Sequence, residues 1–180
     1  MSRLKVLLLA ACMAAAPPAW AQGDAGAVRV RRAKARRAVV VTERGRSHVL
    51  DLTNEIDAAR IEDVSAPFLT RKGGFVYVVL DVCGPSKVPS DDRQCGAGIE
   101  CNLVWLKLDE GWKKVDAGAE RYESCWYPVT SDGGVRVEGR RLSLEFDDLR
   151  EETRCVVAYD ADRPEQGLSV GRKPLPKSTP

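Results

Sequence analysis

The segment from residue 75 to residue 83 is apolar on both of its faces, and this limits the possible folds more than any other feature. In an extended chain Phe75, Tyr77 and Val79 point to one side of the sheet. The valines and the leucine between them point to the other side. A strand that is apolar on both faces has to be covered on both, so we expect it in the middle of the molecule.

A second run of the same kind, residues 101–108, follows after a polar loop. β-Branched and aromatic residues dominate both runs, whereas Gly, Pro, Ser and Asp bound them. Residues 84–100 form the loop, which holds Cys95 and three glycines. The two runs therefore predict a central antiparallel pair of strands joined by a long loop.

Shorter apolar runs separated by turn residues occupy the rest of the chain. They span residues 38–42, 47–52, 61–69, 112–115, 122–129, 135–138, 142–146, 155–159 and 168–170. This spacing predicts an all-β fold, an antiparallel β-sandwich or small barrel of about 8–10 short strands. Residues 54–60 are the only segment of the expected β domain that could form a short helix. No repeat of roughly 20–50 residues is visible, so we expect neither a propeller nor a solenoid.

The register of one hairpin follows from its sequence. A two-residue turn at Gly139–Arg140 places Val137 opposite Leu142 and Val135 opposite Leu144, with all four on one face. Each core side chain contributes about 1.5–3 kcal/mol on burial. We expect the core to contain Val78, Leu80, Val104, Leu106, Val137, Leu144, Phe146 and Val157.

The first 21 residues have the pattern of an export signal. Arg3 and Lys5 precede an apolar run, residues 6–16, and Ala19-Trp20-Ala21 has the small-x-small form that signal peptidase cleaves. The run is shorter than the roughly 20 apolar residues of a permanent membrane span. We therefore expect cleavage after Ala21 and a periplasmic or secreted protein with no transmembrane segment.

A lipoprotein is the minor alternative, because Leu9-Ala10-Ala11-Cys12 resembles a bacterial lipobox. It would leave only eleven residues before a lipidated Cys12, fewer than the roughly 15 of a signal. The abundance of Arg and Ala and the lack of an Asn-x-Ser/Thr site favour a bacterial source. The predicted organisation is a signal (1–21), a basic exposed arm (22–37), a β domain (38–173) and a disordered tail (174–180).

Charge is unevenly distributed along the expected mature chain. The signal carries two basic residues and no acidic one, so 26 of each sign remain. Residues 22–46 contain eight basic residues and two acidic ones, and the remainder is acidic by six. The basic arm could bind an anionic envelope component. No aromatic residue is interleaved with it, so we expect no binding of nucleic acid by base stacking.

Five cysteines remain after the signal, which in an oxidising compartment predicts two disulfides and one free thiol. Cys83 ends one central run and Cys101 begins the next, so we expect them to pair. This bridge closes a loop of about 18 residues and contributes about 3 kcal/mol. A continuous meander would separate Cys125 from Cys155 by ~14 Å, beyond the ~7 Å limit. We therefore expect a Cys95–Cys125 bridge and a buried free Cys155.

The sequence lacks the residue patterns of the common metal, nucleophile and phosphate-binding sites. The cysteines lack the short Cys-x2–4-Cys spacing of zinc sites, and His48 is the only histidine. No Gly-x-Ser-x-Gly elbow or phosphate-binding glycine motif is present. We expect His48 to be structural, and we expect no metal, no cofactor and no catalytic residues.

The remaining candidates suggest two classes of function. Trp126 and Tyr127 could form an exposed aromatic platform or could pack in the core. Asp91, Asp92 and Glu100 share the long loop and could act as binding or acid–base residues. Our leading hypothesis is an exported, non-catalytic β domain that binds a protein or an envelope component. The alternative is a carboxylate-dependent hydrolase acting on envelope polysaccharide.

Overall fold

The computed structural model describes residues 28–87 and 98–176 of the 180-residue chain. These residues form three antiparallel sheets. The N-terminal sheet contains β1 (Arg29–Arg32), β2 (Ala38–Glu43) and β3 (Arg46–Asp51). The central sheet contains β4 (Asp63–Lys72), β5 (Phe75–Pro85), β6 (Ile99–Leu108) and β7 (Lys114–Ser124), in that order. The C-terminal sheet contains β8 (Val129–Thr130), β9 (Arg136–Glu138), β10 (Arg141–Asp148), β11 (Thr153–Asp160) and β12 (Ser169–Pro174).

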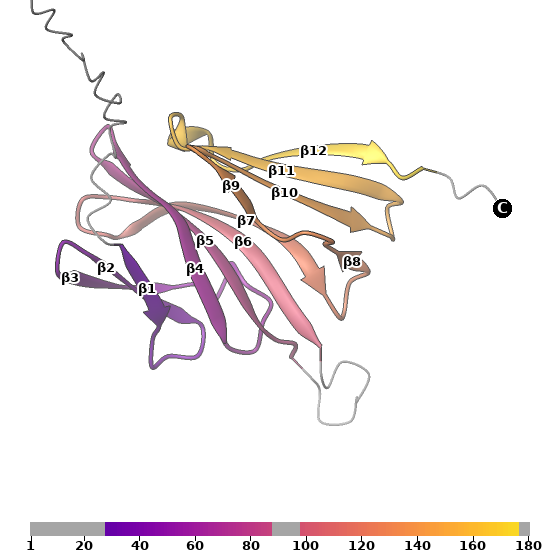
Figure 1. Ribbon diagram of the computed structural model, residues 1–180. Coiled ribbons are helices and arrows are strands. Elements are labelled where there is room, and N and C mark those ends of the chain that lie inside the picture. Colours follow the sequence, from indigo (N-terminus) through magenta and orange to yellow (C-terminus); the bar gives the residue numbers. More distant parts are fainter. Residues whose placement is uncertain (1–27, 88–97, 177–180) are drawn as a thin grey trace, which may run out of the picture.

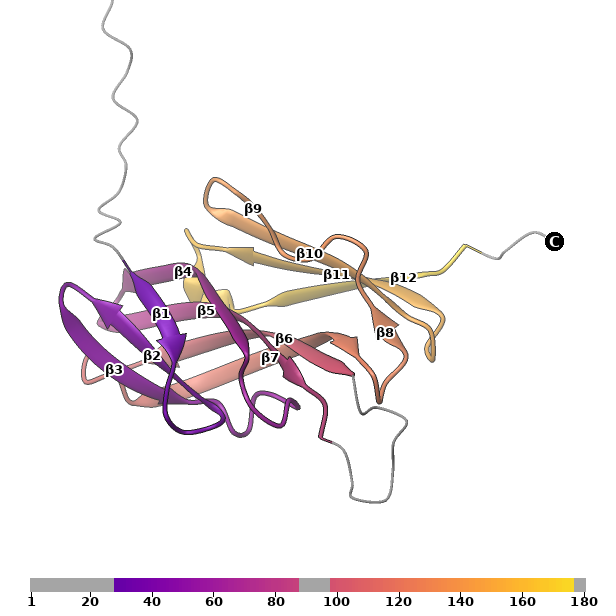
Figure 2. The same cartoon turned by 60° about the horizontal axis from the view of Figure 1, so that its bottom comes forward.

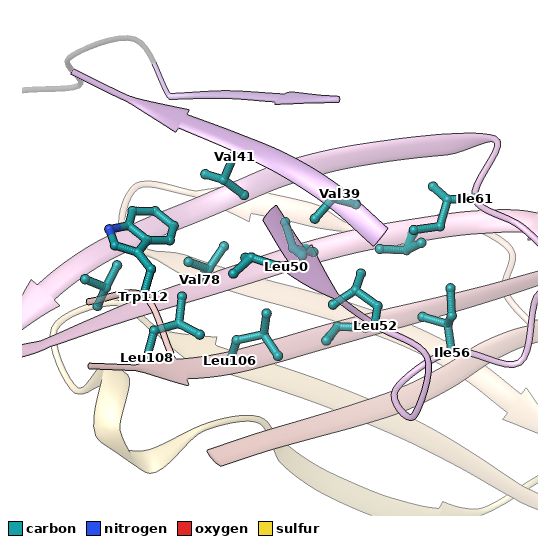
Figure 3. Close-up of a cluster of buried hydrophobic side chains, with 14 of the residues drawn as sticks. Val39, Val41, Leu50, Leu52, Ile56, Ile61, Val78, Leu106, Leu108 and Trp112 are labelled. Atoms are coloured by element: carbon teal, nitrogen blue, oxygen red, sulfur yellow. The ribbon is translucent and has the colours of Figure 1, made fainter. Parts of the chain in front are cut away.

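The central sheet lies between the other two sheets (Figures 1 and 2). One core cluster joins valines and leucines of β2 and β3 to those of β5 and β6 (Figure 3). A second cluster joins the opposite face of the central sheet to β10 and β11. The all-β, disulfide-stapled prediction is confirmed, and the sandwich has three layers.

Strand β5 has the central position that its sequence predicts. Val76, Val78 and Leu80 are fully buried on the side of the N-terminal sheet. Tyr77 and Val79 are buried on the side of the C-terminal sheet. The alternation along one strand therefore divides the interior into two cores.

Of the predicted core residues, seven are buried, and Val137 is not. The register is as expected, because Val137 pairs with Leu142 across the β9–β10 turn. However, all three residues of β9 are exposed, and Val137 is 49% exposed. Pairing fixes the face on which a side chain lies but does not supply a layer to cover it. The prediction that Val137 belongs to the core is therefore wrong.

Three segments differ from the expected elements. Residues 112–115 and 122–129 do not form two strands, because β7 runs without interruption through Ala117, Gly118 and Ala119. Gly118 of this strand pairs with Trp105 of β6. Residues 54–60 form a turn, an irregular stretch and a bend instead of a helix. Ile56 and Ala58 are both buried there, and a spacing of two does not place side chains on one helix face.

The basic segment also contributes more to the fold than its composition indicates. Arg29–Arg32 forms β1, which pairs antiparallel with β2 although most of its side chains are exposed. Val28 and Val30 pack against the first core cluster. At the other end, β12 extends to Pro174, and residues 177–180 lie outside the described residues. In the described part of the chain, no helix has the length and apolar character required to cross a membrane.

Candidate binding surface

The candidate surface lies at one end of the molecule, where β5 ends, β6 begins and β7 leads into β8 (Figures 1 and 2). The Cys83–Cys101 disulfide ties β5 to β6 at this end, as expected, and its Cα atoms are 4.2 Å apart. Cys125, which directly follows β7, is also disulfide-bonded. Its expected partner, Cys95, lies outside the described residues, so that pairing stays a prediction. Cys155 is a buried free thiol, as expected.

The buried carboxylate of Glu100 forms hydrogen bonds with two chain segments at this end. Glu100 is 1% exposed and belongs to β6, whereas the sequence places it in the long loop. Its Oε1 accepts hydrogen bonds from Ser86 Oγ at 2.7 Å and from the Cys125 backbone N–H at 3.2 Å. Within the described residues, its Oε2 is buried and has no hydrogen-bond partner. Glu100 therefore fixes the start of the segment that carries the aromatic pair.

Gly98 permits the close approach of the chain segments here. A Cβ atom at this position would lie 2.4 Å from Cys125 Cβ and 2.8 Å from Ser86 Oγ. The Gly98 carbonyl also accepts a hydrogen bond from the Ser86 backbone N–H at 3.0 Å. Only glycine fits between these neighbours without displacing them.

Trp126 is held in place although it is exposed. Its Nε1–H donates a hydrogen bond to the Lys87 carbonyl at 3.0 Å, and its backbone N–H donates to Ser124 Oγ at 3.1 Å. The residue is 37% exposed. The Nε1–H hydrogen bond fixes one edge of the indole, so part of the ring is available to a partner at a low cost in conformational entropy.

Tyr127 is fixed by a cation–π contact. The Arg121 guanidinium lies 3.8 Å from the centre of the tyrosine ring, and Arg121 also donates two hydrogen bonds to Asp57 Oδ2, at 2.9 and 2.5 Å. The Asp57 backbone N–H donates to Asn102 Oδ1 at 3.4 Å. Tyr127 is 44% exposed and so remains accessible.

Two exposed aliphatic residues lie on chain segments that contact the sequence neighbours of this pair. Ile99 is 46% exposed and pairs with Pro85, next to Gly98. Leu149 is 55% exposed, and its backbone N–H donates to the Pro128 carbonyl at 2.8 Å. We call Ile99, Trp126, Tyr127 and Leu149 the loop-end surface.

The sequence identified only part of this surface. Trp126 and Tyr127 are exposed, so they are not core residues, whereas Glu100 is buried beneath them. Asp91 and Asp92 lie outside the described residues. Sequence reasoning missed Ile99 and Leu149, although both are large apolar residues beside turns.

A second group of polar side chains lies on the face of the central sheet that meets the C-terminal sheet. Tyr122 Oη donates a hydrogen bond to Asp81 Oδ1 at 2.6 Å and lies 3.6 Å from Cys83 Sγ. Burial raises the pKa of the Asp81 carboxyl, and the hydrogen bond from Tyr122 opposes this in part. Burial, followed by the bond to Asp81, raises the pKa of the Tyr122 phenol. These groups stabilise one another in the interior.

His48 lies on β3, away from both groups. Its ring stacks on Trp112 with centroids 3.9 Å apart and planes 3° apart. Burial lowers its pKa, although nearby Glu43 has the opposite effect. Within residues 28–87 and 98–176, no group of three His, Cys, Asp or Glu side chains could hold a metal ion.

Comparisons of the chain with models of protein families, with curated proteins and with solved structures found no match. The chemistry of the candidate surface therefore has to be inferred from its own residues. Apolar and aromatic groups held by hydrogen bonds and by a covalent link are suited to recognition.

Proposed function

We propose that this protein is an exported, non-catalytic β domain that binds another exported protein through the loop-end surface. The observation that carries the proposal is the exposure of two aromatic residues that are already fixed. Trp126 is held by Lys87 and Ser124, and Tyr127 is held by Arg121. Tryptophan and tyrosine are the residues most often found as anchors in protein interfaces, and prior fixation reduces the entropy lost on binding.

Export is supported by the signal pattern of residues 1–21 and by the Cys83–Cys101 disulfide. Disulfides persist in oxidising compartments and are rare in the cytosol. The proposal therefore includes cleavage after Ala21. Amino-terminal sequencing of the mature protein from the periplasmic or secreted fraction should begin at Gln22.

The hydrolase alternative gains no support from Glu100. An acid–base pair has to reach its substrate, whereas the Glu100 carboxylate is buried and accepts hydrogen bonds from Ser86 and Cys125. Asp91 and Asp92 lie outside the described residues.

The test is site-directed cross-linking in the living cell. A photoreactive residue in place of Tyr127 should trap a defined exported protein, whereas the same residue at Val137 should not. Val137 is a suitable control because it is also exposed and apolar but lies at the opposite end of β10.

The trapped protein is then purified, and its affinity is measured against the double variant Trp126→Ala/Tyr127→Ala. Loss of two aromatic anchors should weaken binding by about 2–4 kcal/mol, or 30-fold to 1,000-fold. Val137→Ala should leave the affinity unchanged. Equal affinities of the double variant and the wild type would reject the loop-end surface as the contact.

A further inference from the structure

The most basic part of the molecule is the hairpin of β1 and β2. Between residues 28 and 42 there are six basic residues and no acidic one. Five of the six are exposed: Arg29, Arg31, Arg32, Lys34 and Arg36. Within the described residues, none of the six forms an ion pair. Arg37 lies close enough to Asp51 to help lower the pKa of that carboxyl. The five exposed charges repel one another, so an external anion would stabilise this arrangement.

These charges surround a pocket. The turn between β1 and β2 faces the segment at Arg60 and Ile61 across a shallow, open depression with a volume of about 350 Å³. Its charged lining consists of Arg31, Arg32, Lys34, Arg36 and Arg60, which we call the basic pocket. Only Arg60 has an acidic partner, Glu62, at 2.5 Å.

The backbone of the basic pocket is fixed by the fold. The Ala33 N–H donates to the Ala38 carbonyl at 2.9 Å and closes the turn. The Ile61 N–H donates to the Arg36 carbonyl at 2.8 Å and joins the two walls. Ile61 is 4% exposed and belongs to the same core cluster as β2. The cationic side chains are therefore carried by a framework that is formed before any ligand arrives.

We propose that the basic pocket binds phosphate groups. Arginine presents a planar fork of donors that matches phosphate oxygens in pairs, and four of the five cations are arginines. A single carboxylate would leave most of these charges unpaired, whereas a ligand with two phosphates would neutralise them. The pocket is also large enough for a small phosphorylated group. This site is independent of the aromatic anchors of the loop-end surface.

The basic pocket lies close to the end of β5. Arg60 lies directly against β5, because a Cβ atom at Gly84 would be 1.9 Å from the Arg60 carbonyl oxygen. Gly84 precedes Pro85, which pairs with Ile99 of the loop-end surface. The turn that follows β1 and the end of β5 lie at the same end of the molecule (Figures 1 and 2). The ligand is either a soluble phosphate compound or the headgroup of an anionic lipid.

Two probes distinguish these sources with the proposed mature protein, which begins at Gln22. Inorganic pyrophosphate, titrated by calorimetry at low salt, represents a soluble ligand. Phosphatidylcholine vesicles with and without phosphatidylglycerol, tested by co-sedimentation, represent a lipid surface. Binding of pyrophosphate alone would identify a soluble ligand, and binding that requires phosphatidylglycerol would identify a headgroup; each supports the proposal.

The triple variant Arg31→Gln/Lys34→Gln/Arg36→Gln should weaken binding of the positive probe at least about tenfold. It should also reduce the dependence of affinity on salt, because fewer counterions are exchanged. Arg60→Gln, on the opposite wall, should weaken the same probe less. All four side chains are exposed, so the variants should retain the wild-type circular dichroism spectrum.

The matched control is Lys113→Gln/Arg150→Gln/Lys173→Gln, which removes the same charge from exposed positions on other strands and turns. It should bind like the wild type. The proposal fails if neither probe binds the wild type at low salt. It also fails if the two triple variants weaken binding equally, because the loss of affinity would then result from the change in net charge and not from the basic pocket.

Discussion

The two cores on either side of β5 have the same secondary structure but different chemistry. The core shared with the N-terminal sheet is formed by valine, leucine, isoleucine and alanine, with Trp112 as its only aromatic residue within the described part of the chain (Figure 3). The core shared with the C-terminal sheet contains Tyr77, Trp105, Tyr122 and Tyr159 in addition to cysteines. We call them the aliphatic core and the mixed core.

The difference shows that one protein can keep most of its buried polar and titrating groups in one core and leave the other core almost wholly aliphatic. Aliphatic side chains have no group that titrates or oxidises, so the aliphatic core depends on volume alone. The mixed core buries polar atoms that require partners, such as Trp105 Nε1, which donates to the Pro164 carbonyl at 3.0 Å. Burial also raises the pKa of the Tyr159 phenol to about 12. Sensitivity to pH and redox state in the interior should therefore belong mainly to the mixed core.

The largest effect is expected from a cavity in the aliphatic core. Leu106 is fully buried, so Leu106→Ala should lower the free energy of unfolding by about 2–5 kcal/mol. The loss should be the same across the pH range, because the buried members of the cluster that contains Leu106 are aliphatic residues and Trp112. Urea unfolding at several pH values measures it, and Val49→Ala, at a site 67% exposed, should change stability by less than about 0.5 kcal/mol. A strongly pH-dependent loss would break the distinction between the cores.

The next effect tests the covalent link at the border of the mixed core. The Cys83–Cys101 bridge spans 18 residues, so Cys83→Ala/Cys101→Ala should cost about 3 kcal/mol. The bridge constrains the unfolded chain, and the strands should still pair when it is absent. Chemical unfolding without reductant measures the loss, and the circular dichroism spectrum should remain that of a β protein. A variant as stable as the wild type would show that the sheet contacts alone determine stability here.

A smaller, pH-dependent effect is expected at Asp81 and Tyr122. Tyr122→Phe removes the hydrogen bond to the half-buried carboxylate and should cost about 1–3 kcal/mol near neutral pH. The pKa of Asp81 in the folded protein lies above its ordinary value of 3.8. The protonated carboxyl of Asp81 therefore contributes fully to stability below pH 3.8. This contribution is lost as the pH rises through the pKa that Asp81 has in the folded protein.

Asp81→Asn is the matched test of this sign. The amide oxygen can still accept the hydrogen bond from Tyr122, but the side chain no longer titrates. At pH values above 3.8, the free energy of unfolding of the variant should depend less on pH than that of the wild type. An unchanged pH profile would assign the dependence to another group.

The sequence was sufficient to predict the centre of the fold. Alternation along residues 75–83 placed this strand between two layers, and the spacing of Cys83 and Cys101 identified their bridge. Both predictions rest on local patterns, because in an extended chain the alternation of residues alone determines which side chains share a face and which residues lie opposite each other. The register of the β9–β10 hairpin was predictable for the same reason.

Features that depend on distant segments were not predictable. Strand β1 is basic, and only its pairing with β2 and the packing of Val28 and Val30 make it part of the sheet. The burial of Glu100 and the exposure of Val137 depend on which segments cover them, and the local pattern contains no such information. The loop-end surface was half predictable, because aromatic residues beside a cysteine are visible in the sequence but the exposure of Ile99 and Leu149 is not.

The smallest effect, of opposite sign, is expected where the aliphatic core meets solvent. Arg71 on β4 donates two hydrogen bonds to Glu43 on β2, at 3.1 and 2.5 Å, and joins the two sheets. This bond lowers the pKa of the Glu43 carboxyl below its ordinary value of 4.5. The pair should therefore contribute stability above that value and lose it as the pH falls through the folded pKa.

Glu43→Gln should cost about 0.2–1 kcal/mol near neutral pH and nothing in strong acid, as measured by urea unfolding. Glu62→Gln, at a more exposed pair, should have less effect. If Glu43→Gln instead lost stability mainly in acid, the ion pair would not be what titrates at the edge of the aliphatic core.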